Sequence, residues 1–223
     1  MKLICMGDST MQYNDETTFP QVGWPQALEE KLNKEVRLMN FAKNGRSTRT
    51  FLEEGRFEDA LRFTDRDSIV LIEFGHNDEH THNPERYTRP DFEYRQNLLY
   101  MVSECKKKGA YVLLLTPIYR RWFKDGKLDM SCHEGYREAM LKVAQDSGTD
   151  VVDMCVLTRD KLIETGEKDS REFFMNFDPG IYENYPDGMD DNTHLRMKGA
   201  YMVRDLFLQA VGNDPHFKEY FNV

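Results

Sequence analysis

Cysteine is scarce in this sequence of 223 residues, and its four cysteines lie far apart. Cys5, Cys105, Cys132 and Cys155 form neither a CxxC pair nor a regular series of spacings. This pattern argues against a zinc knot and does not indicate a disulfide framework. Cys5 lies in an apolar strand candidate, so we expect it to be a small buried hydrophobic residue.

Long apolar runs and an excess of positive charge are also missing. No stretch approaches the roughly 20 apolar residues that cross a bilayer, so the sequence predicts no transmembrane helix. The apolar run within the N-terminal segment MKLICMGDST is too short for the hydrophobic region of a secretory signal. We therefore expect either a cytoplasmic protein, which we favour, or a chain whose secretion signal has been removed.

The charge balance bears on partners. Lysine and arginine number 30 against 39 aspartates and glutamates, giving a net charge of −9. That sign is wrong for binding nucleic acid or an anionic membrane, so we expect neither as a partner. The sequence leaves the oligomeric state open.

Short strand candidates alternate with longer helical stretches, over a length that suits one domain spanning residues 1–223. The expected strands are Lys2–Met6, Val36–Phe41, Ser68–Phe74, Tyr111–Thr116 and Asp150–Asp153. The expected helices are Trp24–Leu32, Thr48–Arg62, Asp91–Lys108, His133–Gln145, Val156–Glu164 and Arg196–Leu208. Nearly continuous apolar strands are typical of a sheet covered on both faces. The pattern predicts an α/β fold, a three-layer α/β/α sandwich with a five-stranded parallel sheet.

Polar turns follow the predicted strands. Ligands of an open parallel sheet bind beyond the carboxyl ends of its strands. The segments at those ends are GDST (7–10), NGRS (44–47), GHND (75–78) and PIYRR (117–121), and DNTH (191–194) precedes the last helix. We expect all five to meet at one edge, and we expect Asp178–Asp191 to be one long loop.

Three of these residues have the types needed for nucleophilic catalysis. Ser9 follows a glycine in a turn, although the GxSxG pattern is absent because position 11 is methionine. Asp191 and His194 are three residues apart, so the carboxylate can orient an imidazole that takes the proton of Ser9. The alternative is that Asp190, Asp191, Asn192 or Thr193 caps the last helix.

A developing oxyanion also needs hydrogen-bond donors. The backbone N–H groups of Ser9 and Gly45 and the side-chain amide of Asn77 are candidates, since they follow the first three strands. The alternative for Gly45 and Asn77 is an ordinary role in turns. Their joint arrival at one sheet edge favours the oxyanion hole.

Taken in order, these blocks resemble those of the SGNH (GDSL-like) hydrolase superfamily. The closer resemblance is to its rhamnogalacturonan acetylesterase branch, and it covers residues 2–208. Its marks are GDST, GWPQ (23–26), NGRST, FLEEGR (51–56), EFGHND, the pair Thr116-Pro117 with Arg120-Arg121, and YPDGMDDNTHLRMKGA (185–200). The resemblance implies a flavodoxin-like fold and hydrolysis of an acetylated, pectin-derived saccharide without a cofactor.

The resemblance also implies residue roles. Ser9 is then the nucleophile, His194 the base and acid, and Asp191 its orienter. Ser9, Gly45 and Asn77 supply the oxyanion hole. The missing secretion signal departs from the secreted members and suggests an enzyme that acts on imported fragments.

The histidine-rich segment GHNDEHTH (75–82) raises a second possibility, a metal site. His76, Asp78, His80 and His82 would lie on one side only if the strand continued, and the turn-forming residues argue that it ends. We therefore predict no metal. His76 is expected to orient the loop, and Asp78 to orient the loop or contact substrate.

Arg46, Arg120 and Arg121 follow strand ends and are candidates for gripping the carboxylate of galacturonate. The alternative is ion pairing with the many acidic residues of the chain. A lipid or thioester substrate is a second hypothesis, which the polar character of these segments disfavours. A non-catalytic glycan-binding module and a metal-dependent hydrolase are less favoured still.

Overall fold

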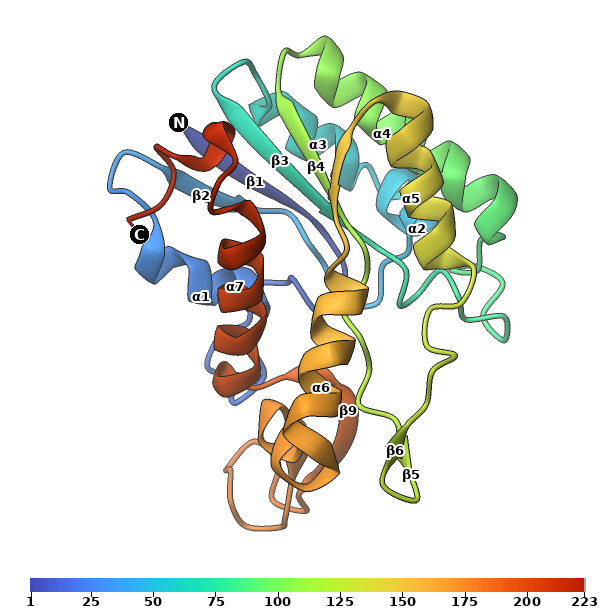
Figure 1. Cartoon of the computed structure of the whole chain (residues 1–223), viewed down its shortest axis with the longest axis vertical. Coiled ribbons are helices and arrows are strands. Elements are labelled where there is room, and N and C mark those ends of the chain that lie inside the picture. The colour runs from blue at the N-terminus through green and yellow to red at the C-terminus, as the bar shows by residue number, and fades with distance from the viewer. Residues whose placement is uncertain (223) are drawn as a thin grey trace.

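A five-stranded sheet forms the centre of the structure, a computed structural model that describes residues 1–222 (Figure 1). All neighbouring strands are parallel, and their order is β2-β1-β3-β4-β7. The strands are β1 (Lys2–Gly7), β2 (Arg37–Asn40), β3 (Ser68–Glu73), β4 (Tyr111–Leu115) and β7 (Asp150–Val152). The predicted parallel sheet is therefore confirmed, with strand ends within one or two residues of those expected.

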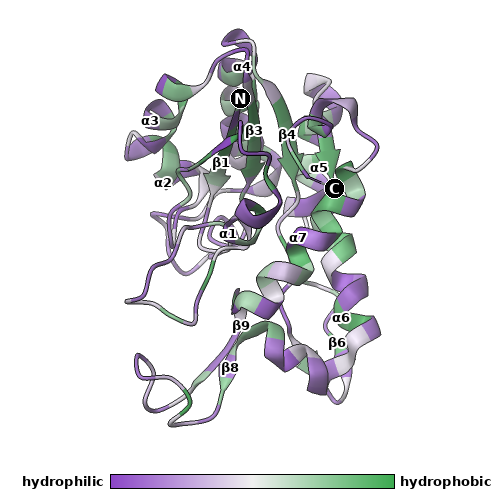
Figure 2. Cartoon of the chain, turned by 90° about the vertical axis from the view of Figure 1, so that its left-hand side faces the viewer, coloured by the Kyte–Doolittle hydropathy of each residue, from purple (hydrophilic) through white to green (hydrophobic). Residues whose placement is uncertain are grey.

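Alternate residues of each strand enter two separate hydrophobic cores. Leu3 and Cys5 of β1 pack on one face, while Ile4 and Met6 pack on the other. The first face is covered by α1 (Trp24–Leu28), α6 (Met154–Ser170) and α7 (Met197–Val211). The second is covered by α2 (Thr48–Glu53), α3 (Arg56–Phe63), α4 (Arg95–Lys107) and α5 (Tyr136–Ser147). Figure 2 shows the mostly hydrophobic β3 and β4 between these layers, as the predicted three-layer sandwich requires.

Several predicted helices are divided or extended. The expected helix over residues 48–62 is two helices, because Gly55 has a φ of 71° and interrupts the helical path between them. A π-turn at Pro90–Tyr94 precedes α4, and a 3₁₀ turn at Glu29–Lys31 follows α1. These changes leave the order of strands and helices as predicted.

Two small hairpins were not predicted. One joins β8 (Phe174–Phe177) to β9 (Met189–Leu195), so the loop expected over 178–191 is confined to residues 178–188. The other joins β5 (Phe123–Lys124) to β6 (Lys127–Leu128). The N-cap of α7 is Arg196, so the capping alternative for residues 190–193 is wrong.

The aromatic C-terminal segment packs on the first helical layer. Phe217 and Phe221 are buried and stack on each other, and both contact Phe207 of α7. The backbone of Asn33 donates to Tyr220, which ties this segment to the chain after α1. Within residues 1–222, no helix is long and apolar enough to cross a membrane.

Candidate active site

Ser9 lies in the turn that leaves β1 at its carboxyl end. The carbonyl of Asp8 accepts hydrogen bonds from the backbone of Met11 and Gln12, which closes the turn immediately after the strand. Ser9 is buried, with 6% of its surface exposed. The chain brings this hydroxyl to the edge expected from the position of the strand.

His194 connects Ser9 to Asp191. Its Nε2 lies 2.9 Å from Ser9 Oγ, and its Nδ1 lies 2.6 Å from Asp191 Oδ2. The other carboxylate oxygen accepts the backbone N–H groups of Thr193 and His194. Burial would raise the pKa of Asp191, but these hydrogen bonds and the nearby imidazole outweigh it and lower that pKa. Asp191 is therefore held as a carboxylate facing the imidazole.

The position of β9 follows from its pairing with two other segments. Phe174 of β8 pairs with Leu195, and the backbone N–H of Val22 donates to Leu195 from the opposite side at 3.0 Å. Arg121 donates from its backbone and its guanidinium to Asn192, at 2.8 and 2.7 Å. Asp191 and His194 are thus fixed by neighbours on a strand rather than by a helix terminus.

Hydrogen bonds to backbone carbonyls connect the segments that carry the expected oxyanion donors. The N–H of Lys43 donates to Gly7, and the Nδ2 of Asn77 donates to the carbonyl of Arg46 at 3.1 Å. Gly45 has a φ of 76°, a conformation that L side chains rarely adopt, so glycine suits this turn. The second hydrogen of the Asn77 amide remains available for another acceptor.

Arg120, Arg121 and Asp78, predicted to bind substrate, are largely used within the protein. Arg120 pairs with Glu79 and donates to the carbonyl of His76, which fixes the loop that carries Asn77. Arg121 supports β9 as described, and both arginines are buried. Asp78 is fully buried and accepts from Thr48 and Thr88, which fits the predicted loop-orienting role.

Arg46 remains the most open of the three arginines. Its side chain is 28% exposed and pairs with Glu54 across the surface. Its Nη1 also donates to the carbonyl of Asn44, next to Gly45. A substrate-binding role stays a prediction for all three arginines, and these contacts favour Arg46.

The segment proposed as a metal alternative does not gather its four side chains. Asp78 faces the threonines named above, whereas His76 is buried beside Asp8, with 3.3 Å between Nδ1 and Oδ2. His80 and His82 lie on the exposed loop beyond. Within residues 1–222, one trio of metal-ligand type converges elsewhere, Asp8, Glu73 and His76.

That trio belongs to a buried polar network around the turn of Ser9, which was not predicted from the sequence. The Thr10 hydroxyl lies 2.9 Å from Asp8 Oδ1 and 2.7 Å from Glu73 Oε1. The indole N–H of Trp24 donates to the other oxygen of Glu73 at 3.0 Å, and Trp24 is fully buried. A glutamate at the end of the apolar run Ile69–Ile72 was the available sequence signal.

Arg86 is another residue near the site that was not predicted from the sequence. Its guanidinium packs against Gly45, with the central carbon 3.2 Å from the point where a Cβ on that glycine would lie. Among the hydrogen bonds and ion pairs of residues 1–222, its side chain has no partner. A cation with free donors therefore adjoins the expected oxyanion hole.

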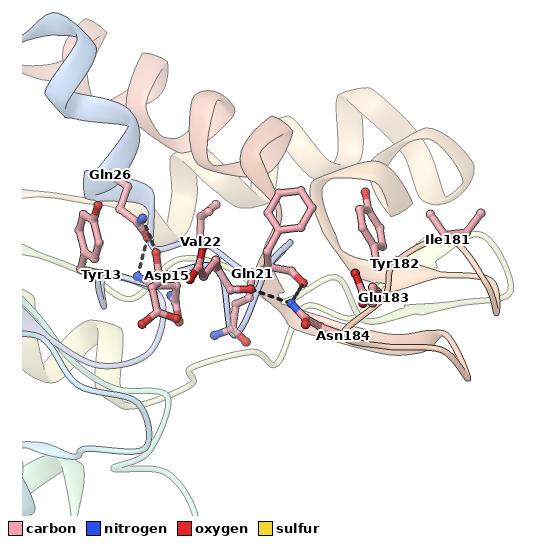
Figure 3. Close-up of a pocket in the computed structure, with 12 residues that line it drawn as sticks. Tyr13, Asp15, Gln21, Val22, Gln26, Ile181, Tyr182, Glu183 and Asn184 are labelled. Carbon is pink, nitrogen blue, oxygen red and sulfur yellow. Dashed lines mark hydrogen bonds between the residues drawn. The ribbon is translucent and has the colours of Figure 1, made fainter.

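A pocket of about 630 Å³ lies next to Val22, the residue that pairs with Leu195 of β9 (Figure 3). Tyr13 and Gln26 lie toward one end, and Ile181 and Tyr182 toward the other. Val22, which pairs with the residue after His194, lines the pocket and connects it to β9.

The fold and the polar groups at its carboxyl edge define the class of esterases built on a three-layer α/β sandwich. Residues 5–200 match the GDSL-like Lipase/Acylhydrolase family, and the chain belongs to that family. The family predicted from the ordered sequence blocks is thereby confirmed, and the chain is an esterase.

Curated relatives and solved structures agree with this placement. Rhamnogalacturonan acetylesterase RhgT of Bacillus subtilis is 32% identical over 95% of this chain and 89% of its own. The rhamnogalacturonan acetylesterase of Emericella nidulans is 27% identical over 92% and 82%. The crystal structure of YxiM from Bacillus subtilis superposes with a TM-score of 0.79 at 23% identity, covering 95% of this chain and 56% of that one. An acetylxylan esterase from Geobacillus stearothermophilus gives a TM-score of 0.66 at 18% identity, over 96% and 94%, and it shows the same fold.

Proposed function

We propose that this esterase removes acetyl groups from pectin-derived saccharides of the rhamnogalacturonan type by a Ser-His-Asp acyl-enzyme mechanism. The observation that carries the proposal is the position of His194, within hydrogen-bond distance of both Ser9 Oγ and Asp191 Oδ2. This is the geometry that a nucleophile, a base and an orienting carboxylate require. The two relatives named as rhamnogalacturonan acetylesterases support the substrate.

In the first half of the proposed reaction, Ser9 Oγ attacks the acetyl carbonyl carbon while His194 Nε2 takes its proton. Negative charge develops on the carbonyl oxygen, where the N–H groups of Ser9 and Gly45 and the free amide hydrogen of Asn77 donate. His194, now protonated and held by Asp191, gives the proton to the departing sugar oxygen. The products are a free sugar hydroxyl and acetyl-Ser9.

In the second half, His194 takes a proton from a water molecule that attacks acetyl-Ser9. The same three donors stabilise the second oxyanion, and the proton returns to Ser9 Oγ as acetate leaves. Histidine suits both steps because its ordinary pKa lies near neutrality.

A uronic acid in the substrate would be recognised by a guanidinium beside the site. Arg46 was predicted for this role, and Arg86 is a second candidate because it adjoins Gly45 with free donors. A planar guanidinium binds a carboxylate through two parallel hydrogen bonds. These cations suit an acidic saccharide better than a long acyl chain.

The test is acetate release from a panel of acetylated pectin oligosaccharides of different lengths, with wild type and Ser9→Ala compared. A short aryl acetate and a longer aryl ester are measured in parallel. We expect acetate release and short-chain activity in the wild type, and loss of both in the variant. Preference for the longer ester would favour the lipid alternative, and equal rates in both proteins would favour a binding module.

A further inference from the structure

The pocket in Figure 3 combines aromatic surface with negative charge. Its lining includes the rings of Tyr13 and Phe19, which are 56% and 54% exposed. It also includes the carboxylates of Asp15, Glu16 and Glu183, and its lining residues, all within 1–222, contain no lysine, arginine or histidine. Such a pocket offers flat apolar faces together with strong hydrogen-bond acceptors.

The walls of the pocket are tied together before any ligand enters. Asn184 Nδ2 donates to the carbonyls of Glu16 and Phe19, at 2.8 and 2.9 Å. Gln26 Nε2 donates to the carbonyl of Asn14, and the ring of Tyr182 packs edge-on against Phe19 with 5.6 Å between centroids. A preformed pocket binds with a smaller loss of conformational entropy.

The pocket also adjoins the catalytic groups. Val22 lines it and donates its backbone N–H to Leu195, the neighbour of His194. Tyr13 follows Ser9 by four residues, and the intervening Gln12 accepts the N–H of Asn44 beside Gly45 at 2.6 Å. A saccharide with its acetyl group at Ser9 would therefore have further sugar residues near this pocket.

We propose that the pocket is a subsite for an uncharged sugar ring of the substrate and that its carboxylates reject uronic acid rings. The proposal rests on the proposed function and deepens it. Sugar C–H groups pack on Tyr13 and Phe19, and sugar hydroxyls donate to Glu16 and Glu183. A uronate would be repelled by three carboxylates here and attracted to Arg86 beside Gly45, so the two regions orient the saccharide.

Binding and kinetics test this subsite. In Ser9→Ala, titration with uncharged oligosaccharides should give saturable binding that Tyr13→Ala weakens about 3- to 10-fold. The same change in the active enzyme should raise KM for acetylated oligosaccharides by a larger factor than KM for an aryl acetate. Phe92→Ala removes an exposed ring elsewhere and serves as the matched control.

The proposed rejection of uronic acid rings is tested separately, by removing carboxylates from the pocket. Glu16→Gln combined with Glu183→Gln should improve binding of uronate-containing oligosaccharides relative to uncharged ones. Equal binding of both classes by Ser9→Ala, or unaltered binding when Tyr13→Ala is added to it, would overturn the subsite. If the proposed function is wrong, the wild type will release no acetate from saccharides. The binding measurements do not depend on acetate release, so they test the subsite in either case.

A second inference comes independently from the buried polar network around the turn of Ser9. One hydroxyl, that of Thr10, contacts a carboxylate oxygen of Asp8 and another of Glu73. A hydroxyl has one proton to donate, so two ionised carboxylates cannot both be satisfied. If Glu73 is protonated, Glu73 donates to Thr10 and Thr10 donates to Asp8, and every contact has a proton.

The surroundings of Glu73 favour the protonated form of its carboxyl group. Burial and the charge of Asp8 raise the pKa of Glu73 to about 8. The titratable and charged groups around this cluster are Cys5, Asp8, His76, Asp78, Tyr94, Arg120 and His133. Burial lowers the pKa of His76 to about 3, so no cation from that ring offsets a second carboxylate.

We infer that protonated Glu73 is a positioning residue for the turn that carries Ser9. Asp8 and Thr10 flank Ser9, so the shared proton holds both sides of the nucleophile that we propose. Loss of this proton places two negative carboxylates on either side of one hydroxyl. The turn then shifts, and the contact between Ser9 and His194 lengthens.

The pH profile tests this inference. Because the pKa of Glu73 is raised, its protonated form stabilises the turn at low pH. This stabilisation is lost as the pH rises through about 8. Wild-type kcat should therefore decline above that pH. Glu73→Gln keeps a donor to Thr10 and an acceptor for Trp24 and cannot ionise, so it should retain neutral-pH activity within about 3-fold and lose the alkaline decline.

A measurement on the wild type keeps the inference testable if that variant fails to fold. With glutamate carboxyl carbons labelled, NMR should show one glutamate titrating near pH 8, and this signal should be missing in Glu73→Gln. Absence of any glutamate titrating above pH 7 would overturn the inference, as would an unchanged alkaline decline in Glu73→Gln. Both readouts are separate from the loss of activity expected for Ser9→Ala.

Discussion

Asp191 holds His194 at two points, with one carboxylate oxygen 2.6 Å from the ring Nδ1 and the other 3.0 Å from the backbone N–H of the same residue. The ring cannot rotate without losing the first contact, and the backbone cannot move without losing the second. The carboxylate therefore fixes the direction of the imidazole and favours the tautomer with a proton on Nδ1, which leaves Nε2 to accept the Ser9 proton in the proposed reaction.

Asp191→Asn should lower kcat by roughly 10³- to 10⁴-fold because its amide N–H would face Nδ1 and favour the wrong tautomer. Aryl acetate turnover measures the loss. Asp190→Asn, which alters the neighbouring carboxylate that accepts from Asn176, is the matched control and should retain activity. Similar losses in both variants would mean that the effect comes from disturbing β9.

Ser9→Ala should lower kcat by at least about 10⁴-fold, since it removes the proposed nucleophile together with its proton. An organophosphate should add its mass to the peptide containing GDST in the wild type and leave the variant unlabelled. Label on a different peptide would contradict the role of Ser9.

Gly45→Ala should lower kcat by about 10-fold or more because it displaces a backbone N–H that we propose as an oxyanion donor. Its Cβ would lie 3.2 Å from Arg86 in a backbone conformation with a φ of 76°. Gly126→Ala has the same φ and open space around its Cβ, so it controls for the backbone strain alone. Stability should fall by about 1–2 kcal/mol in both variants, and kcat should fall only in Gly45→Ala.

Arg86→Gln should raise KM about 10-fold for acetylated saccharides that contain uronic acid, corresponding to about 1.4 kcal/mol of binding. Turnover of a neutral aryl acetate should not change. Arg89→Gln, which removes a surface charge paired with Glu93 on the same segment, should leave both substrates unaffected. An equal effect of Arg86→Gln on both substrates would assign Arg86 to the fold rather than to recognition.

Dialysis against EDTA should leave esterase activity intact. Asp78 is buried against Thr48 and Thr88, so it is unavailable to join His80 and His82 around an ion. The measurement is aryl acetate turnover before and after dialysis. Loss of most activity, restored by a divalent cation, would revive the metal alternative.

The strands and their order of appearance were predictable because their signal is local. Runs such as Ile69–Ile72 are long enough to require burial on both faces, and turn-forming residues such as Gly75 and Asn77 mark where that strand ends. The edge at which Ser9, Gly45 and Asn77 gather then follows from the rule for parallel sheets.

The hairpin that carries Asp191 and His194 was not predictable in the same way. β9 reads MDDNTHL, which is mostly polar, and it is a strand because it pairs with β8 and with Val22 far away in the sequence. A tertiary contact therefore overrides a local preference for a turn or a cap. The β5–β6 hairpin did have a local signal, the pair Asp125-Gly126, which suits a tight turn with two positive φ angles.

The side chains of the substrate-binding region show a different limit. The sequence placed Arg120 and Arg121 at the correct edge, but their burial depends on partners such as Glu79 and Asn192 from other segments. Arg86, in a loop with turn-forming neighbours, had no feature that distinguished it before Gly45 was seen beneath it.

The burial of all four cysteines leaves the protein surface free of reactive thiols. Desolvation raises the pKa of Cys105 and of Cys155 to about 12, and that of Cys5 further, so their thiolates are scarce near neutral pH. A thiol introduced by Ile181→Cys, at an exposed position on the pocket rim, would accept a fluorescent maleimide selectively. The native cysteines would therefore contribute little background label in a fluorescence assay of saccharide entry.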